Sequence, residues 1–237
     1  WRKLVYNPTD DVVAPRARDA IVEAWTQDEA RRFLEHAQER GSRFLDLYIF
    51  ALGTGMRQSE ILGLRWIDVD LERRLVSVRQ TLAKPGLTPV FKEVPKTKKS
   101  RRTIDISESL AERLARIRAT QDVLKAAAGA GYRDYGLVFA QGNGLPFDPA
   151  NMVNRDFNTL VRALRNDVTR ITFHGLRHTH LTDLMRRGIS PKIVSERAGH
   201  SSVAFTMDVY GHVFPGMQRE AAAAIDDLLV GADTERD

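Results

Sequence analysis

The spacing of hydrophobic residues along the chain is mostly helical, and it changes in one central stretch. Apolar positions three and four residues apart predict helices over 26–37, 42–52, 107–124, 149–164, 172–187, 190–199 and 217–230. Between the predicted helices over 42–52 and 107–124, short runs rich in β-branched residues predict three strands over 75–82, 90–94 and 102–106. The expected fold is therefore mainly α with a small antiparallel β-sheet, an α+β protein.

Polar residues at the starts of the predicted helices support these boundaries. Thr26 and Glu29 have the spacing of a capping box. Ser107 and Thr172 each precede a run of helical periodicity, as N-cap residues do. A serine followed by proline at 190–191 predicts another helix start, because proline is favoured at the first helical position.

The chain divides into three parts by composition. Residues 1–25 contain prolines and charges but few apolar positions, and we expect an interdomain linker there. Residues 26–216 carry the periodic segments of one folded domain. Residues 217–237 are expected to form a helix and an acidic tail. Because the chain begins at Trp1 without a methionine, we expect it to belong to a longer protein.

Composition narrows the classes of function. The chain has 237 residues, 28% charged and 43% hydrophobic, as ordinary globular proteins do. There is no cysteine, which excludes disulfides, a thiolate nucleophile and a cysteine metal site. No signal peptide or membrane-spanning apolar run is visible, so a cytoplasmic protein is expected. The net charge of +5 is compatible with a polyanionic partner.

Positive charge is concentrated in one segment. Residues 92–102 hold six basic residues and one acid, and residues 95–101 among them connect the second and third predicted strands. A lysine-rich tip on a small sheet can reach into a groove of DNA, although a solvated loop is the simpler alternative. The candidate DNA-binding residues are Lys98, Lys99, Arg101 and Arg102.

Candidate catalytic residues gather near the C-terminal end, in the runs TFHGLRHTH and ERAGHSSVAFTMDVYGH. His174 and Arg177 are three apart, so on a helix they project from one face. The next predicted helix ends at a glycine and leaves His200 on a loop, and a short third helix carries Tyr210 near its end. Each residue alone has an ordinary structural explanation, but together they suit phosphodiester chemistry.

Two further histidines, His178 and His180, lie in the first of these runs. A metal site is one interpretation of so many histidines. However, the two are two residues apart and do not face the same way on a helix, and no cysteine is available as a further ligand. We assign both to structure, in the interior or at the helix surface.

An earlier segment, TGMRQSEILGLRW, predicts a short helix with Arg57 in its first turn. A cation at that position opposes the helix dipole, so Arg57 is expected to have a negatively charged partner. Glu60 follows three residues later, and a weak surface ion pair between the two residues is the ordinary alternative.

Five segments together resemble the successive boxes of the tyrosine recombinases, the phage integrase family. In order they are TGMRQSEILGLRW, PKTKKSRRTI, FHGLRHTH, ERAGHSS and MDVYGHV, and the resemblance extends over about residues 26–213. It implies the catalytic-domain fold of that family for residues 26–216. It also implies an active site made of Arg57, Lys96, His174, Arg177, His200 and the nucleophile Tyr210, with Glu60 orienting Arg57. Lys98 and Lys99 lie close enough to Lys96 to leave the register of the lysine open.

The implied activity is that of a site-specific recombinase, an integrase that cleaves and rejoins DNA through a 3′-phosphotyrosine intermediate. Arg57 and Arg177 would bind the non-bridging phosphate oxygens, and His200 would add a hydrogen bond. His174 is the expected base for Tyr210, and Lys96 the expected acid for the departing 5′ oxygen. No metal ion, ATP or other cofactor is required. A topoisomerase of the IB type and a non-catalytic DNA-binding module are the alternatives.

The resemblance also implies partners. We expect double-stranded DNA at attachment sites, a homotetramer assembled on that DNA, accessory DNA-bending or directionality proteins, and no membrane. The role would be phage or mobile-element integration or excision, at the nucleoid of a bacterial host. The family usually has an N-terminal core-binding domain, which we expect to be absent from this chain. The predicted helix over 217–230 is expected either to dock on a neighbouring protomer or to pack on its own core.

Overall fold

The computed structural model describes residues 23–94, 101–211, 222–223 and 225–226. The sequence-based predictions for residues 1–22, for Lys96, Lys98 and Lys99, and for most of 212–237 lie outside these residues. The helices are α1 (Gln27–Glu39), α2 (Leu45–Thr54), α3 (Gln58–Leu62), α4 (Glu108–Ala128), α5 (Pro149–Asn151), α6 (Asn158–Ala163), α7 (Phe173–Arg186), α8 (Pro191–Ala198) and α9 (Val203–Tyr210). The strands are β1 (Val69–Asp70), β2 (Leu75–Val78), β3 (Gln80–Lys84), β4 (Val90–Glu93) and β5 (Arg102–Asp105).

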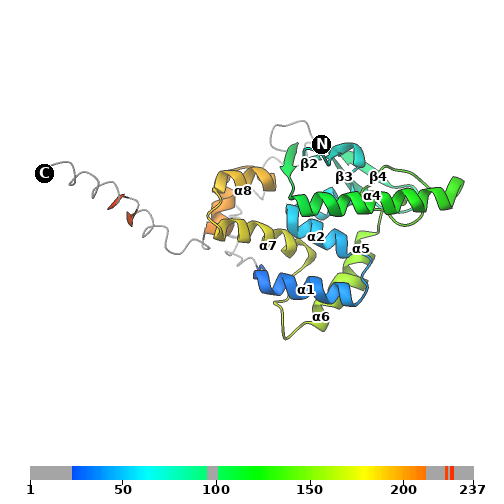
Figure 1. The fold of residues 1–237 in the computed structure, drawn as a ribbon. Helices are drawn as coiled ribbons and strands as arrows, with labels where there is room; N and C mark the ends of the chain where they lie inside the picture. Colours follow the sequence, from blue (N-terminus) through cyan, green and yellow to red (C-terminus); the bar gives the residue numbers. More distant parts are fainter. Residues whose placement is uncertain (1–22, 95–100, 212–221, 224, 227–237) are drawn as a thin grey trace, which may run out of the picture.

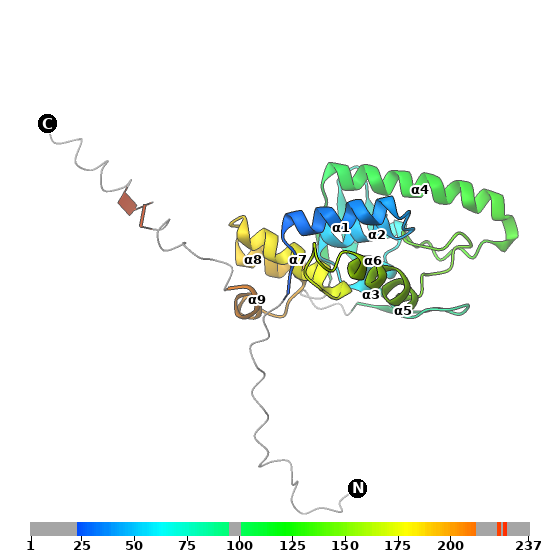
Figure 2. The ribbon, with the colours of Figure 1, turned by 90° about the horizontal axis from the view of Figure 1, so that it is seen from below.

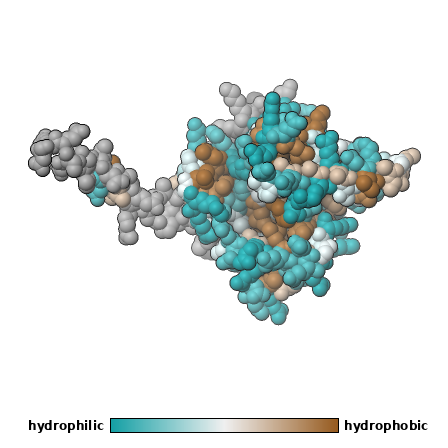
Figure 3. All heavy atoms as spheres, viewed as in Figure 1, coloured by the Kyte–Doolittle hydropathy of each residue, from teal (hydrophilic) through white to brown (hydrophobic). Residues whose placement is uncertain are grey.

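The fold is mainly helical with small antiparallel sheets, as the sequence predicted. In both views, α8 and α9 lie at one end of the body, and α4 extends to the opposite end together with the β3–β4 hairpin (Figures 1 and 2). Helix α7 connects the two parts, because it packs on α2 and also on α8 and α9. None of the described helices is long and apolar enough to cross a bilayer. The face in Figure 3 is mostly hydrophilic, with small separate hydrophobic areas.

Local capping signals were predicted correctly in two helices. Thr26 and Glu29 form the capping box of α1, and the Ser107 side chain accepts a hydrogen bond from the Leu110 backbone N–H at the start of α4. Thr172 occupies the N-cap position of α7 but makes no side-chain capping bond. The helix predicted over 149–164 is present as three consecutive pieces, because residues Met152–Phe157 form a π-helical turn between α5 and α6.

The prediction of one continuous strand over 75–82 is wrong. The chain divides at Arg79, so that β2 pairs with β1 and β5, whereas β3 pairs with β4 in a separate sheet. The reason is the close approach of β3 to the end of α3. Gln80 Nε2 donates to Gly63 O at 3.1 Å, and a Cβ on Gly63 would lie 2.7 Å from the backbone of β3. Only glycine allows this contact, which draws β3 out of the first sheet.

The larger core contains a cluster of aromatic rings from α1, α2, α7 and the π-helical turn. Trp25 packs on Phe33 with ring centroids 4.8 Å apart and on Phe157 at 6.3 Å. Its indole N–H donates to Thr169 O at 2.7 Å, and the residue is 1% exposed. The predicted linker therefore cannot extend to residue 25, because Trp25 belongs to the folded domain.

A second, smaller core joins α7, α8 and α9. It consists of Leu181, Met185, Val194, Ala198 and Tyr210, all buried. The tyrosine of the last motif is thus part of the packing that holds α9 on α7 and α8. Its position is set by this core, at the end of the molecule where the other candidate residues lie.

Replacing Trp25 by alanine should lower the free energy of unfolding by about 3–5 kcal/mol, because a fully buried aromatic side chain is removed. Urea denaturation followed by circular dichroism measures this. The control is Ile67→Ala, since Ile67 is 86% exposed, and its effect should stay below about 0.5 kcal/mol. A Trp25→Ala variant as stable as the control would place the domain boundary after residue 25.

Candidate active site

The C-terminus of α8 gathers three arginine side chains. The helix ends at Gly199, whose φ of +66° suits glycine, and its last carbonyl groups have no partner within the helix. Each of three successive carbonyl oxygens instead accepts a hydrogen bond from a different arginine. The pairs are Arg197 O with Arg102 Nε (2.8 Å), Ala198 O with Arg177 Nη2 (2.7 Å) and Gly199 O with Arg57 Nη2 (3.3 Å). The negative end of the helix dipole favours cations at this place.

The three arginines come from distant parts of the chain. Arg57 is the N-cap residue of α3, Arg102 begins β5, and Arg177 lies in the first half of α7. Arg177 Nη1 also donates to Gly55 O at 2.6 Å, which ties α7 to the α2–α3 connection. A Cβ on Gly55 would lie 2.5 Å from the His180 ring, and its φ is +64°, so a glycine is required there.

Glu60 is the carboxylate that bridges two of these arginines, Arg57 and Arg102. Its side chain is 4% exposed, and each oxygen accepts two hydrogen bonds. Oε1 accepts from Arg57 Nη1 (2.9 Å) and Arg102 Nη1 (2.9 Å), and Oε2 accepts from Arg102 Nη2 (2.7 Å) and the Arg57 backbone N–H (2.8 Å). Burial alone would raise the pKa of Glu60, but the bonds and charge of Arg102, and then of Arg57, lower it to about 2. The Glu60 carboxylate is therefore buried and pairs with the equally buried Arg102, whereas Arg57 stays partly exposed, so this is more than the weak surface pair that was the alternative.

The cluster has an excess of positive charge. Three guanidinium groups face the single carboxylate of Glu60, which leaves two positive charges (3 − 1 = 2). Burial, and then the charges of Arg57 and Arg102, lower the pKa of Arg177 to about 10. Arg177 thus stays protonated at neutral pH. Because the Arg57 side chain is 44% exposed, an anion from solvent can reach the cluster.

Tyr210 lies beside this cluster and is 1% exposed. Its hydroxyl oxygen is 2.6 Å from Nδ1 of His178. The His200 ring is parallel to the tyrosine ring to within 6°, with centroids 6.4 Å apart, and its Nδ1 is 2.8 Å from the Thr206 hydroxyl. Burial raises the pKa of Tyr210 to about 12, although the charge of Arg177 opposes this rise. The phenol is therefore neutral until a base removes its proton.

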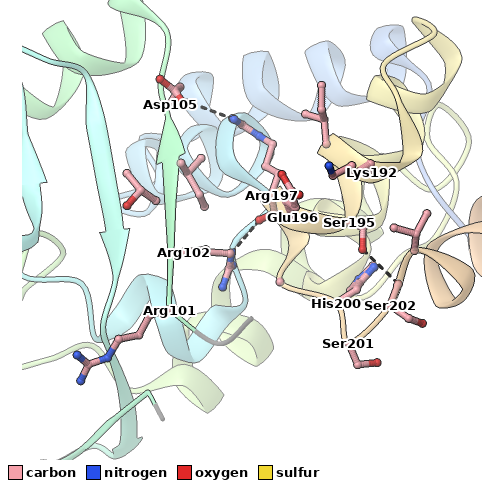
Figure 4. A pocket seen from close by; sticks show the side chains of 15 residues that line it. Arg101, Arg102, Asp105, Lys192, Ser195, Glu196, Arg197, His200, Ser201 and Ser202 are labelled. Atoms are coloured by element: carbon pink, nitrogen blue, oxygen red, sulfur yellow. Dashed lines mark hydrogen bonds between the residues drawn. The ribbon is translucent and has the colours of Figure 1, made fainter. Parts of the chain in front are cut away.

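A groove of about 600 Å³ borders the cluster between β5 and α8 (Figure 4). Arg102, one of the candidate DNA-binding residues, points toward α8, and its side chain is 7% exposed because it binds Glu60 and Arg197 O. Arg101 points away from α8 and pairs with Glu93 at 3.1 Å. Its Nε also donates to Val94 O at 3.3 Å, which joins the two ends of the segment that contains the lysines.

A comparison of the whole sequence with protein-family models identifies the family of this chain. The model described as "Phage integrase family" matches residues 23–216, which is most of the chain. The chain belongs to the phage integrase family.

Curated members of the family are longer than this chain. The tyrosine recombinase XerC-like protein of Caldanaerobacter subterraneus subsp. tengcongensis is 33% identical over 220 residues, covering 88% of this chain and 55% of that protein. The ICEBs1 integrase of Bacillus subtilis is 30% identical over 227 residues, covering 95% of this chain and 60% of that integrase. The chain thus spans between half and two thirds of the length of these relatives.

Solved structures of phage-integrase-type enzymes have the same fold. The Tn1549 transposon integrase in complex with transposon right end DNA superposes with a TM-score of 0.73 and 25% identity, covering 93% of this chain and 70% of that chain. The catalytic domain of bacteriophage HP1 integrase gives a TM-score of 0.55 at 21% identity, covering 85% of this chain and 94% of that domain. The second likeness concerns the fold alone. The fold is that of a tyrosine-recombinase catalytic domain.

Four of the six residues expected in an integrase active site come together around the end of α8. Arg57, Arg177, His200 and Tyr210 lie there, and Lys96 lies outside the described residues. His174 is exposed and makes no hydrogen bond to another described residue, but it lies near the same cluster: its ring is edge-on to that of His178 at 4.6 Å, and burial, then the charges of Arg177 and Arg57, lower its pKa.

The residue that sequence reasoning missed is His178. Comparing His178 with His180 showed that those two do not share a helix face. Comparing it with His174, four residues earlier, would have placed both on the side of α7 that meets the tyrosine. His180 is structural, as expected: its Nδ1 is 2.7 Å from Leu52 O, and its Nε2 accepts a hydrogen bond from Arg197 Nε at 2.9 Å.

Replacing Glu60 by glutamine should lower the free energy of unfolding by about 3–5 kcal/mol at pH 7, because the buried guanidinium of Arg102 loses its counter-charge. The pKa of Glu60 is lower in the folded chain (about 2) than its ordinary value of 4.5. Its contribution is therefore complete above pH 4.5 and is lost as the pH falls toward 2.

Urea denaturation of both chains at several pH values tests this prediction. The difference between wild type and Glu60→Gln should shrink below pH 4.5. The matched control is Glu35→Gln, since the Glu35 side chain is 56% exposed and its ion pair with Arg31 is weak. A difference that persists unchanged at low pH would contradict a charged Glu60.

Proposed function

We propose that this chain is the catalytic part of a site-specific DNA recombinase, an integrase that cleaves and rejoins DNA through a 3′-phosphotyrosine. The observation that supports this most is the excess positive charge held beside Tyr210 by the end of α8. A phosphodiester carries one negative charge, and its pentacoordinate transition state carries more. A preorganised cationic cluster therefore stabilises the transition state more than the bound substrate.

Arg57 and Arg177 hold the non-bridging oxygens in this proposal. Although Arg177 already binds two carbonyl oxygens, each terminal nitrogen has a second N–H that remains available for a phosphate. When the Thr206 hydroxyl donates to Nδ1 of His200, Nε2 carries the ring proton and donates to a phosphate oxygen. The two arginines and His200 thus bind the phosphate from different elements.

Strand cleavage forms the bond between the Tyr210 oxygen and phosphorus while the bond from phosphorus to the 5′ oxygen breaks. The phenolic proton passes to a histidine of α7, for which the family resemblance implies His174. The 5′ oxygen receives a proton from the basic segment, where Lys96 is the first candidate and Lys98 and Lys99 are the alternatives. Rejoining is the reverse reaction with a new 5′-hydroxyl. Because the phosphotyrosine bond keeps the energy of the broken bond, the proposed reaction requires neither ATP nor a metal ion.

The biological role that we propose is integration or excision of a mobile element or phage. The relatives support it, because they include the ICEBs1 integrase and the Tn1549 transposon integrase in complex with DNA. We further propose a homotetramer on double-stranded attachment sites, with accessory bending or directionality proteins, at the nucleoid in the cytoplasm of a bacterial host. A type IB topoisomerase is the second candidate, and relaxation of a plasmid without an attachment site would favour it.

The chain should form a covalent adduct with DNA that depends on Tyr210 and resists EDTA. The substrate is a pool of nicked duplexes with randomised sequence around the nick, so that no attachment site has to be known. Adducts are recovered with the protein and sequenced. Tyr210→Phe should give none, and Arg57→Ala should slow adduct formation by roughly 10²–10³-fold.

Either of two results would contradict this proposal. An adduct that persists in Tyr210→Phe would assign the nucleophile to another residue. Wild-type chain that binds the pool but yields no adduct would favour a non-catalytic DNA-binding module. Binding itself should weaken steeply with salt, because phosphate contacts release counterions.

The lysine that protonates the 5′ oxygen can be identified with a 5′-bridging phosphorothiolate, whose sulfur leaves without a proton. Lys96→Ala should slow cleavage of ordinary DNA by about 10²–10⁴-fold and cleave the phosphorothiolate at nearly the wild-type rate. Lys98→Ala and Lys99→Ala serve as matched controls: as candidate DNA-binding residues they should weaken DNA binding, but with saturating protein they should cleave both substrates at nearly the wild-type rate. If one of these controls showed the rescue instead, the register of the lysine would shift to it.

A further inference from the structure

The hydroxyl group of Tyr210 has a single hydrogen-bond partner among the described residues, and that partner is His178. The oxygen–nitrogen distance of 2.6 Å is short for such a pair. The contact is enclosed, because the tyrosine belongs to the small core between α7, α8 and α9 and is 1% exposed. The geometry therefore fixes which histidine of α7 meets the phenolic proton.

We propose that His178 is a catalytic residue of the cleavage reaction, the base that holds the Tyr210 hydroxyl through Nδ1 and takes up its proton during attack on the phosphate. This inference rests on the proposed function and deepens it, since it names the proton acceptor. It replaces His174 in that role. His174 is then free to hydrogen-bond the phosphate.

The charge state of His178 allows it to accept the hydrogen bond from Tyr210, and the proposal takes the tautomer in which Nδ1 is the unprotonated nitrogen. Burial, then the charges of His174 and Arg177, lower the pKa of His178 to about 4. At neutral pH the ring is therefore neutral and has one unprotonated nitrogen. With Nδ1 as the acceptor, the phenol donates its proton to His178, and the lone pairs of the phenolic oxygen are left to attack phosphorus.

A bound phosphate makes His178 a stronger base. The groups that face it are His174 and Arg177 on α7, His200 on the loop before α9, and Tyr210 on α9. The negative charge of a phosphodiester offsets the charge of Arg177, so the pKa of His178 rises when DNA is in place. The imidazole then accepts the proton only when the electrophile is present.

His174 occupies a different position. Burial, and then the charges of Arg177 and Arg57, lower the pKa of His174, whereas the arginine whose charge lowers the pKa of His178 is Arg177. His174 is also exposed. It therefore lies toward the arginine cluster and the solvent, where a phosphate would bind, and His178 lies toward the tyrosine.

The proton balance of the step is complete within the proposed site. The Tyr210 oxygen–phosphorus bond forms, the bond from phosphorus to the 5′ oxygen breaks, and the phenolic proton moves to Nδ1 of His178. The leaving oxygen receives its proton from the lysine. In the rejoining step the attacking 5′-hydroxyl gives its proton to the now neutral lysine, the bond from phosphorus to the Tyr210 oxygen breaks, and the imidazolium of His178 returns the proton to the departing phenolate.

The test compares His178→Asn with His174→Asn on nicked DNA, using both the phosphodiester and the 5′-bridging phosphorothiolate. The amide oxygen of asparagine takes the place of Nδ1 and accepts the same hydrogen bond, but it is not a base. His178→Asn should therefore cleave about 10²–10⁴-fold more slowly on both substrates, with unchanged DNA affinity. His36→Asn, which alters a histidine of α1, should match wild type.

Two results would overturn the inference while leaving the proposed function intact. One is cleavage by His178→Asn within threefold of the wild-type rate. The other is a larger loss in His174→Asn than in His178→Asn on the phosphorothiolate. Absence of any adduct with the wild-type chain would instead overturn the proposed function, and the inference with it.

A second measurement needs neither DNA nor an altered His178. Nitrogen-15 NMR of the histidine rings in the DNA-free chain reports which nitrogen carries the proton. We expect Nδ1 of His178 to be unprotonated at pH 7, with a resonance that moves in Tyr210→Phe because the hydrogen bond is lost. A protonated Nδ1, or a resonance that does not respond to Tyr210→Phe, would contradict the assigned hydrogen bond.

Discussion

The active site depends on the hydrogen bonds between three arginines and the carbonyl groups at the end of α8. Three like charges so close together repel one another, and water cannot screen them well in a partly buried site. The helix carbonyls and the carboxylate of Glu60 offset only part of this repulsion. The remaining positive charge lies beside Tyr210, where in the proposed function the negative charge of a phosphodiester would offset it.

The same helix end also fixes the groups that we propose to act on a phosphate. His200 follows Gly199 directly, and the small core of α7, α8 and α9 buries Tyr210 beside His178. Residues that are far apart in the sequence thus meet within one chain before any DNA is present. A site of this kind needs little reorganisation at the moment of reaction, which is the condition for strong electrostatic stabilisation.

Much of the fold and part of the site could be predicted, because the signals are local or come in order along the chain. The capping box at Thr26 and the helical spacing of His174 and Arg177 need only a few residues to be recognised. Burial of Trp25 could not be predicted, since it depends on Thr169, 144 residues away.

The same limit applies to Arg102. In the sequence it belongs to a basic run that is typical of a solvated surface. Only the approach of β5 to α8 turns its guanidinium inward, onto Glu60 and the helix carbonyl. His178 was missed for a related reason, because a helix wheel shows which face a residue shares but not which side chain lies opposite.

The arginine cluster and the tyrosine beside it belong to one chain, so we propose that each chain cleaves DNA with its own tyrosine. Two impaired variants, Tyr210→Phe and a size-tagged Arg57→Ala, are mixed on nicked DNA to test this. We expect no adduct above the level of Arg57→Ala alone, because the intact tyrosine lies beside a damaged cluster. An adduct restored on the tagged chain would contradict it, since its tyrosine would then be attacking in the intact cluster of another chain.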